Sequence, residues 1–109
     1  MQRFGSHTEP AIDSTVRIVD GVQLVESTLS PGQYPAIMVQ EGLPVKWTIH
    51  AANEDINGCN YKMILSAYSI EHLFEAGDNL IEFVPGDTGT IVYTCWMGMI
   101  QGRIVVTGT

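Results

Sequence analysis

The chain has 109 residues, of which 45% are hydrophobic, so it can bury one core and leaves no room for a second. With 12 acidic and 5 basic residues, the formal net charge is −7. No basic stripe exists to neutralise phosphates, which argues against nucleic-acid binding, and an anionic membrane surface would repel the chain. No apolar run is long enough to span a bilayer.

The first 13 residues are polar and predict a disordered lead-in, in which Gly5-Ser6-His7 resembles a cloning remnant. This segment lacks the apolar core of a secretory signal. We therefore expect one folded domain over residues 14–109. We also expect it to be a soluble part of a larger, exported or membrane-anchored protein.

Short strand patterns separated by turn residues fill the first half of the domain. Within the fourth strand Val45, Trp47 and Ile49 share one face, so His50 falls on the opposite face. Asp20-Gly21 predicts a hairpin turn between the first two strands. The expected strands are Thr15–Val19, Val22–Thr28, Ala36–Gln40 and Val45–His50.

The second half continues in the same way after a polar loop over residues 51–60. Residues 61–74 give no clear pattern beyond a short strand and a helical turn. Gly77-Asp78-Asn79 predicts a turn. The remaining expected strands are Leu80–Phe83, Ile91–Cys95 and Gly102–Thr107. Many short strands with Gly/Pro turns and no long amphipathic helix predict an all-β fold, an antiparallel sandwich or barrel with loops clustered at its ends.

Two segments far apart in the sequence carry the chemistry. Gly58-Cys59-Asn60 and Cys95-Trp96-Met97-Gly98-Met99 hold both cysteines and the only closely spaced methionines. Thiolate and thioether sulfurs are soft ligands that select Cu(I) or a similarly thiophilic ion. The same cysteines could instead form a disulfide or be inert buried thiols, and a metal site when reduced is compatible with a disulfide when oxidised.

From about Gln33 to Val106 the sequence resembles the cupredoxin family. The resemblance rests on the segments 34–47, 77–83, 90–95 and 102–106. The two cysteine segments resemble, more narrowly, cupredoxin-like domains attached to bacterial heavy-metal transport membrane proteins. The resemblance implies an antiparallel Greek-key β-sandwich with a copper site at one end.

Blue-copper members of that family use a histidine, a cysteine, a second histidine and an axial methionine. By resemblance, Cys59 takes the place of the first histidine and Cys95 matches the thiolate ligand. No histidine follows Cys95, and Met97 and Met99 are the ligand-capable side chains there. We favour Met99, because it can close a compact loop with Cys95, and we keep Met97 as a further candidate. Such a set stabilises Cu(I) and disfavours easy cycling to Cu(II).

Other residues near these segments have weaker claims. Trp96 either packs at the rim or covers the ion as a cation–π lid. Asn60 is expected to tie the two ligand loops together by hydrogen bonds. His50 could supply a nitrogen, although strand parity directs it away from the core, and His72 and His7 have still weaker claims.

The expected function is to hold or transfer Cu(I) in metal handling outside the cytoplasm, with a copper transporter or metallochaperone as partner. One alternative is an electron-transfer protein with an atypical copper centre. Another is a metal-free interaction domain with a Cys59–Cys95 disulfide. We do not expect an enzyme, because no catalytic triad, paired acid and base, or phosphate-binding loop is recognisable.

Overall fold

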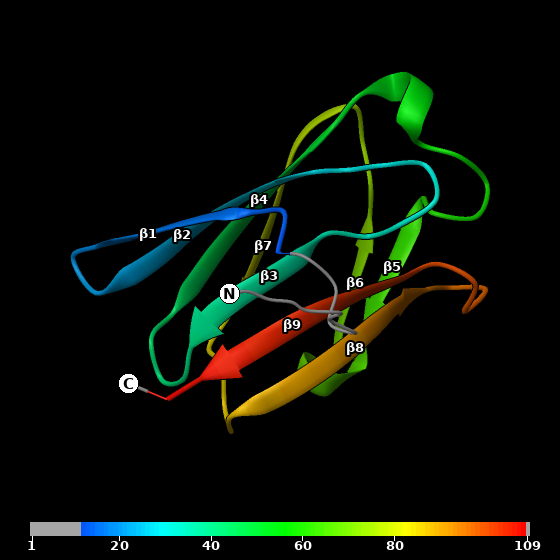
Figure 1. The fold of residues 1–109 in the computed structure, drawn as a ribbon. Coiled ribbons are helices and arrows are strands. Elements are labelled where there is room, and N and C mark those ends of the chain that lie inside the picture. The colour runs from blue at the N-terminus through cyan, green and yellow to red at the C-terminus, as the bar shows by residue number, and fades with distance from the viewer. Residues whose placement is uncertain (1–11, 109) are drawn as a thin grey trace, which may run out of the picture.

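The computed structural model describes residues 12–108, which form two facing β-sheets (Figure 1). The strands are β1 (Thr15–Val19), β2 (Val22–Thr28), β3 (Ala36–Gln40), β4 (Val45–Ala51), β5 (Lys62–Leu65), β6 (Ile70–Leu73), β7 (Gly77–Phe83), β8 (Gly89–Cys95) and β9 (Gln101–Thr107). Two single 3₁₀ turns, η1 (Asn53–Asp55) and η2 (Ser66–Tyr68), interrupt them. No helix among residues 12–108 is long and apolar enough to cross a membrane.

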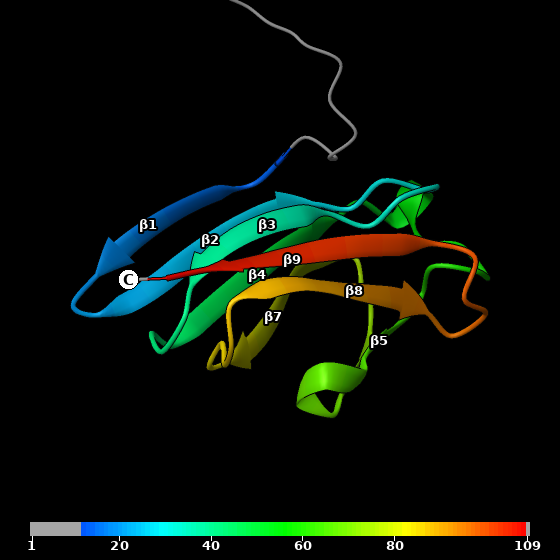
Figure 2. The ribbon, with the colours of Figure 1, turned by 60° about the horizontal axis from the view of Figure 1, so that its bottom comes forward.

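The strands are ordered β1-β2-β4-β7 in the first sheet and β3-β9-β8-β5-β6 in the second. Figure 2 shows β3, β9 and β8 side by side in the second sheet. The pairs β2–β4 and β3–β9 are parallel, and the other strand pairs in the described residues are antiparallel. Parallel neighbours require crossover connections, so the chain passes between the sheets instead of forming hairpins throughout. The all-β sandwich prediction is confirmed.

Alternation along each strand fills the space between the sheets. In β4, Val45, Trp47 and Ile49 are buried as predicted. The Trp47 indole N–H donates to Ser27 Oγ at 2.9 Å, which satisfies the polar group that burial removes from water. The Trp47 ring meets Tyr93 edge-on, with ring centroids 5.6 Å apart. This packing fixes β4 against β8, the strand that ends at Cys95.

The predicted bounds of β1, β2 and β3 agree with the structure, and Asp20 and Gly21 have φ of 52° and 77°, as a type I′ hairpin turn requires. The predicted turn at residues 77–79 is wrong, since these residues open β7 and pair with β4. Gly77 enters the strand with φ of 106°. The buried Asn79 side chain accepts from the Glu75 N–H and donates to the Ile49 carbonyl, so it serves a strand entry.

The segment 61–74 contains the expected short strand and helical turn, as β5 and η2, and also the short strand β6. The predicted lead-in, with Gly5-Ser6-His7, lies mostly outside the described residues. The boundary at residue 14 remains a prediction, and β1 begins at Thr15.

Candidate metal centre

Two loops meet at one end of the sandwich and bring the cysteines together (Figure 1). Cys59 lies in the connection from β4 to β5, and Cys95 is the last residue of β8. Their Sγ atoms are 3.6 Å apart, and both thiols are free. A zinc–thiolate bond is about 2.3 Å long, so two sulfurs up to about 4.6 Å apart can share an ion of that size. The pair is therefore close enough to bind one metal ion together.

Cys95 is held by its own loop and is 1% exposed. Its N–H donates to the Ile100 carbonyl at 2.9 Å, and the Ile100 N–H donates to Cys95 Sγ at 3.4 Å. Gly98, with φ of 74°, closes the turn by donating to the Cys95 carbonyl. Burial acts to raise the pKa of Cys95, but hydrogen bonds from the Ile100 N–H, the Cys59 thiol and the backbone of Met97 and Met99 outweigh it, and the pKa is lowered. Cys95 is thus the thiol of the pair that ionises first.

Cys59 is half-buried in a turn stabilised by an asparagine. Asn57 Oδ1 accepts from the N–H groups of Cys59 and Asn60, at 2.9 Å and 2.8 Å. Burial, followed by the hydrogen bond and charge of Cys95, raises the pKa of Cys59. One thiolate opposes the ionisation of the other, and a bound cation would offset that repulsion.

Asn60 is fully buried and supports the Cys59 loop from below. Its Oδ1 accepts from the Asn57 N–H and its Nδ2 donates to the Asp55 carbonyl, both at 2.8 Å. Its backbone carbonyl accepts from the Tyr34 hydroxyl at 2.7 Å. None of these hydrogen bonds of Asn60 extends to the loop that follows Cys95. The expectation that Asn60 ties the two ligand loops together is therefore corrected, because its bonds hold the Cys59 loop and do not extend to the loop after Cys95.

Trp96 makes the connection between the loops that was expected of Asn60. Its indole N–H donates to the Gly58 carbonyl at 3.1 Å, and its backbone N–H donates to the Lys62 carbonyl at 3.0 Å. The ring packs edge-on against Tyr61, with centroids 6.1 Å apart, and remains 49% exposed. The sequence predicts packing or a lid for this ring and carries no local signal for the indole N–H as a link between the loops.

Met97 and Met99 project from the loop that follows Cys95 and are 50% and 76% exposed. Methionine usually fills gaps in cores, and these two do not. In contrast, Met63 is fully buried and is the register partner of Cys95 in the β5–β8 pair, so both side chains lie on the core side of that sheet. No sequence pattern pointed to Met63, because it falls in the segment 61–74, which showed no clear pattern.

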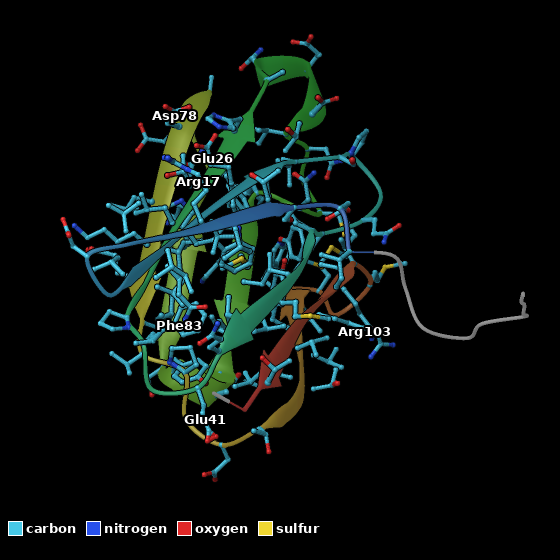
Figure 3. All side chains as sticks on the ribbon, turned by 60° about the vertical axis from the view of Figure 1, so that its left-hand side comes forward. Arg17, Glu26, Glu41, Asp78, Phe83 and Arg103 are labelled. Atoms are coloured by element: carbon cyan, nitrogen blue, oxygen red, sulfur yellow. The ribbon has the colours of Figure 1, made fainter. Side chains whose placement is uncertain are left out.

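His50 lies on the outer face of the first sheet, where strand parity predicts it. Its Nδ1 and Nε2 are 2.5 Å from Asp78 Oδ1 and 3.1 Å from Glu26 Oε1. Figure 3 shows Glu26 and Asp78 on the same part of this sheet. Hydrogen bonds to Glu26 and then Asp78 raise the pKa of His50. His50 is therefore engaged with two carboxylates and not with the cysteines.

His72 Nε2 bonds to Asn79 Oδ1 at 2.9 Å, and His7 lies outside the described residues. Among residues 12–108, no three His, Cys, Asp or Glu side chains are grouped to hold a metal ion. The thioethers of Met97 and Met99, which follow Cys95 in sequence, and of Met63, which pairs with Cys95 across β5 and β8, are further soft groups close to Cys95 in sequence or register.

No protein-family model matches the sequence, and no curated protein matches it. Solved structures do match the fold. An NMR structure of a copper-binding protein in the apo form has 18% identity and a TM-score of 0.75, over 84% of this chain and 94% of that one. The metal-binding domain of the Cu(I)-exporting P-type ATPase CopA of Streptococcus pneumoniae D39, solved with Cu(I), has 22% identity and a TM-score of 0.72, over 84% and 92%.

A reduced Cu(I) form of a mutant of amicyanin has 18% identity and a TM-score of 0.51, over 87% of this chain and 99% of that chain. Amicyanin is a cupredoxin, and at these identities the likeness concerns the fold. The two facing sheets of this chain and its matches to these structures together show the cupredoxin-like fold that the sequence resemblance implies.

Proposed function

We propose that this domain binds Cu(I) through the thiolates of Cys59 and Cys95 and the thioether of Met99, with Met97 as a further candidate. The observation that carries the proposal is the 3.6 Å separation of the two Sγ atoms. Similar folds solved as copper-binding proteins, one of them with Cu(I), support copper as the ion.

The donor set favours Cu(I) over zinc and over the Cu(II) state of a blue-copper centre. Thiolate and thioether are soft ligands, whereas zinc prefers nitrogen or thiolate partners to thioether. The loop after Cys95 has no histidine, so the two-histidine set of a blue-copper centre is missing. When bound, the ion would supply the positive charge that lets both neighbouring thiols ionise. Electron transfer is therefore the weaker candidate.

The exposure of the site suits transfer of the ion. Cys95 anchors one side from the core, while Cys59 is half-buried and Met99 lies in solvent. A thiolate of a partner can approach from the exposed side and replace the ligands one at a time. We propose that the partner is a copper transporter or a metallochaperone outside the cytoplasm, and that this domain is attached to a membrane-anchored protein. Under this proposal the domain exchanges ligands and catalyses no covalent reaction.

Competition for Cu(I) against a chromogenic chelator, on fully reduced protein, tests the proposal. We expect one ion to be withdrawn from the chelator per chain, binding to be lost in Cys59→Ser and in Cys95→Ser, and affinity to fall in Met99→Leu. Met38→Leu is the matched control, since Met38 is an exposed methionine on β3.

Failure of the parent protein to compete, or cysteine variants that compete as well as the parent, would remove the copper site. Strong visible absorption with Cu(II) together with a reversible voltammetric couple would instead identify the electron-transfer alternative.

A further inference from the structure

We propose that Cys59 and Cys95 form a thiol–disulfide exchange site, in which a small-molecule disulfide reacts at Cys59 and Cys95 resolves the adduct into an internal disulfide. The observations are the contact between the two sulfurs and the unequal exposure of the two thiols. The consequence for copper rests on the proposed function, whereas the exchange itself does not.

The geometry allows the bond with a small local movement. A disulfide needs its sulfurs about 2.05 Å apart, so the two Sγ atoms must approach by about 1.5 Å from their present 3.6 Å. Cys95 is fixed at the end of β8 and by two hydrogen bonds with Ile100. Cys59 lies outside the strands and follows Gly58, a position with open space around it. The movement therefore falls on the Cys59 side chain and its loop.

Exposure sets the order of the two steps. An external disulfide can reach the half-buried Cys59, whereas Cys95 is enclosed by the core. In the first step the Cys59 sulfur gives up its proton and attacks a disulfide RSSR, because it is the sulfur that RSSR can reach although Cys95 is the more acidic thiol; a Cys59–SR bond forms and one RS⁻ leaves. In the second step the Cys95 thiolate attacks the Cys59 sulfur and the second RS⁻ leaves. The two thiols lose two electrons and two protons, which convert RSSR into two RSH.

The internal disulfide closes the candidate metal site, because neither sulfur is then a thiolate. Conversely, a Cu(I) ion held by both sulfurs would block the first step. Cu(I) binding and disulfide formation use the same two sulfurs, so each disfavours the other to the same degree. The site would therefore accept Cu(I) in reducing surroundings and refuse it in oxidising surroundings.

Incubation of the metal-free protein in glutathione redox buffers, followed by acid quenching and intact mass measurement, tests the exchange. We expect the parent to lose two hydrogens without retaining glutathione. We expect Cys95→Ser to retain one glutathione on Cys59, and Cys59→Ser to stay unmodified over the same time. Equal modification of the two variants, or a parent that keeps glutathione or stays reduced, would overturn the proposal.

Peptide mapping of the parent at early times provides a test that needs no variant. Cleavage after Lys62 separates the two cysteines of the reduced chain, so an adduct can be assigned. We expect the transient glutathione on the Cys59 peptide, and an adduct on the Cys95 peptide would contradict the order of steps.

Repeating the incubation with one equivalent of Cu(I) separates this proposal from the proposed function. Protection of both thiols is the result expected when both hold. A disulfide that forms equally with and without Cu(I), in a protein that fails to compete with the chelator, would refute copper binding and leave the exchange site intact. A protein that binds Cu(I) but forms no disulfide when metal-free would refute the exchange site alone.

Discussion

Removal of the Asn60 side chain gives the sharpest test of how the Cys59 loop is built. Its amide is fully buried and makes two hydrogen bonds of 2.8 Å, one from the Asn57 N–H and one to the Asp55 carbonyl. Its two other contacts, at 3.5 Å to the Ser30 and Pro31 carbonyls, are at the limit of hydrogen bonding. Asn60→Ala therefore leaves two backbone groups without their partner.

The expected cost follows from those two groups. A backbone group that loses its hydrogen bond in a buried place costs about 1–3 kcal/mol. Asn57 and Asp55 are near the surface, so water can partly replace the amide, and the lower end of the range applies to each. We expect Asn60→Ala to lower the free energy of unfolding by about 2–3 kcal/mol, including the small cavity that it leaves.

Urea unfolding at equilibrium, with the metal-free reduced protein, measures this difference. Asn53→Ala is the matched control, because Asn53 is an exposed asparagine in the same connection, and we expect it to stay within about 0.5 kcal/mol of the parent. A second readout is Cu(I) affinity, which should fall in Asn60→Ala as the Cys59 loop loses its shape. Equal stability of the two variants would refute the reasoning.

Three further predictions address the core, the surface and the metal. Gly102→Ala places a Cβ against the Tyr93 ring and should cost about 2 kcal/mol in urea unfolding, whereas Gly86→Ala, in open space, should be nearly neutral; equal costs would contradict the close approach. The imidazolium of His50 is held between two carboxylates, which raise its pKa in the folded state. Its contribution to folding stability is therefore complete below about pH 6.5, the ordinary pKa of histidine, and disappears as the pH rises through the raised folded-state pKa. Because all three side chains are well exposed, His50→Gln should destabilise by only about 0.5 kcal/mol near pH 5 and by less near pH 9, and an equal loss at both would oppose this assignment. Free Cu(I) at about 100 times Kd should raise the unfolding free energy by about 2.7 kcal/mol in the parent and not in Cys95→Ser. Thermal unfolding of both proteins with and without Cu(I) measures this, and an equal shift in the two, or no shift in the parent, would contradict it.

Several strands were predictable because their burial follows a simple alternation. Val45, Trp47 and Ile49 in β4 point inward, and the parity that buries them also places His50 on the outer face. The type I′ turn at Asp20-Gly21 was predictable from the sequence because its residues tolerate positive φ. The closeness of the two cysteines was implied by resemblance alone, since they lie 36 positions apart in the sequence.

The parts that could not be predicted depend on partners distant in sequence. Residues 77–79 have turn composition, and only pairing with β4 makes them a strand. The link from Trp96 to the Gly58 carbonyl joins two loops whose approach no local pattern encodes. The close packing of Tyr93 over Gly102 likewise follows from the register of β8 and β9. Local propensity is a weak guide where tertiary contacts decide the conformation.

Copper K-edge X-ray absorption on the Cu(I)-loaded, reduced protein tests the central claim most directly, because it identifies the atoms bound to the ion. We predict a shell of sulfur alone, with one sulfur fewer in Met99→Leu and no change in Met38→Leu. A nitrogen or oxygen atom in the first shell, or a sulfur shell that is unaltered in Cys59→Ser and Cys95→Ser, would contradict a site built from these two cysteines and a thioether.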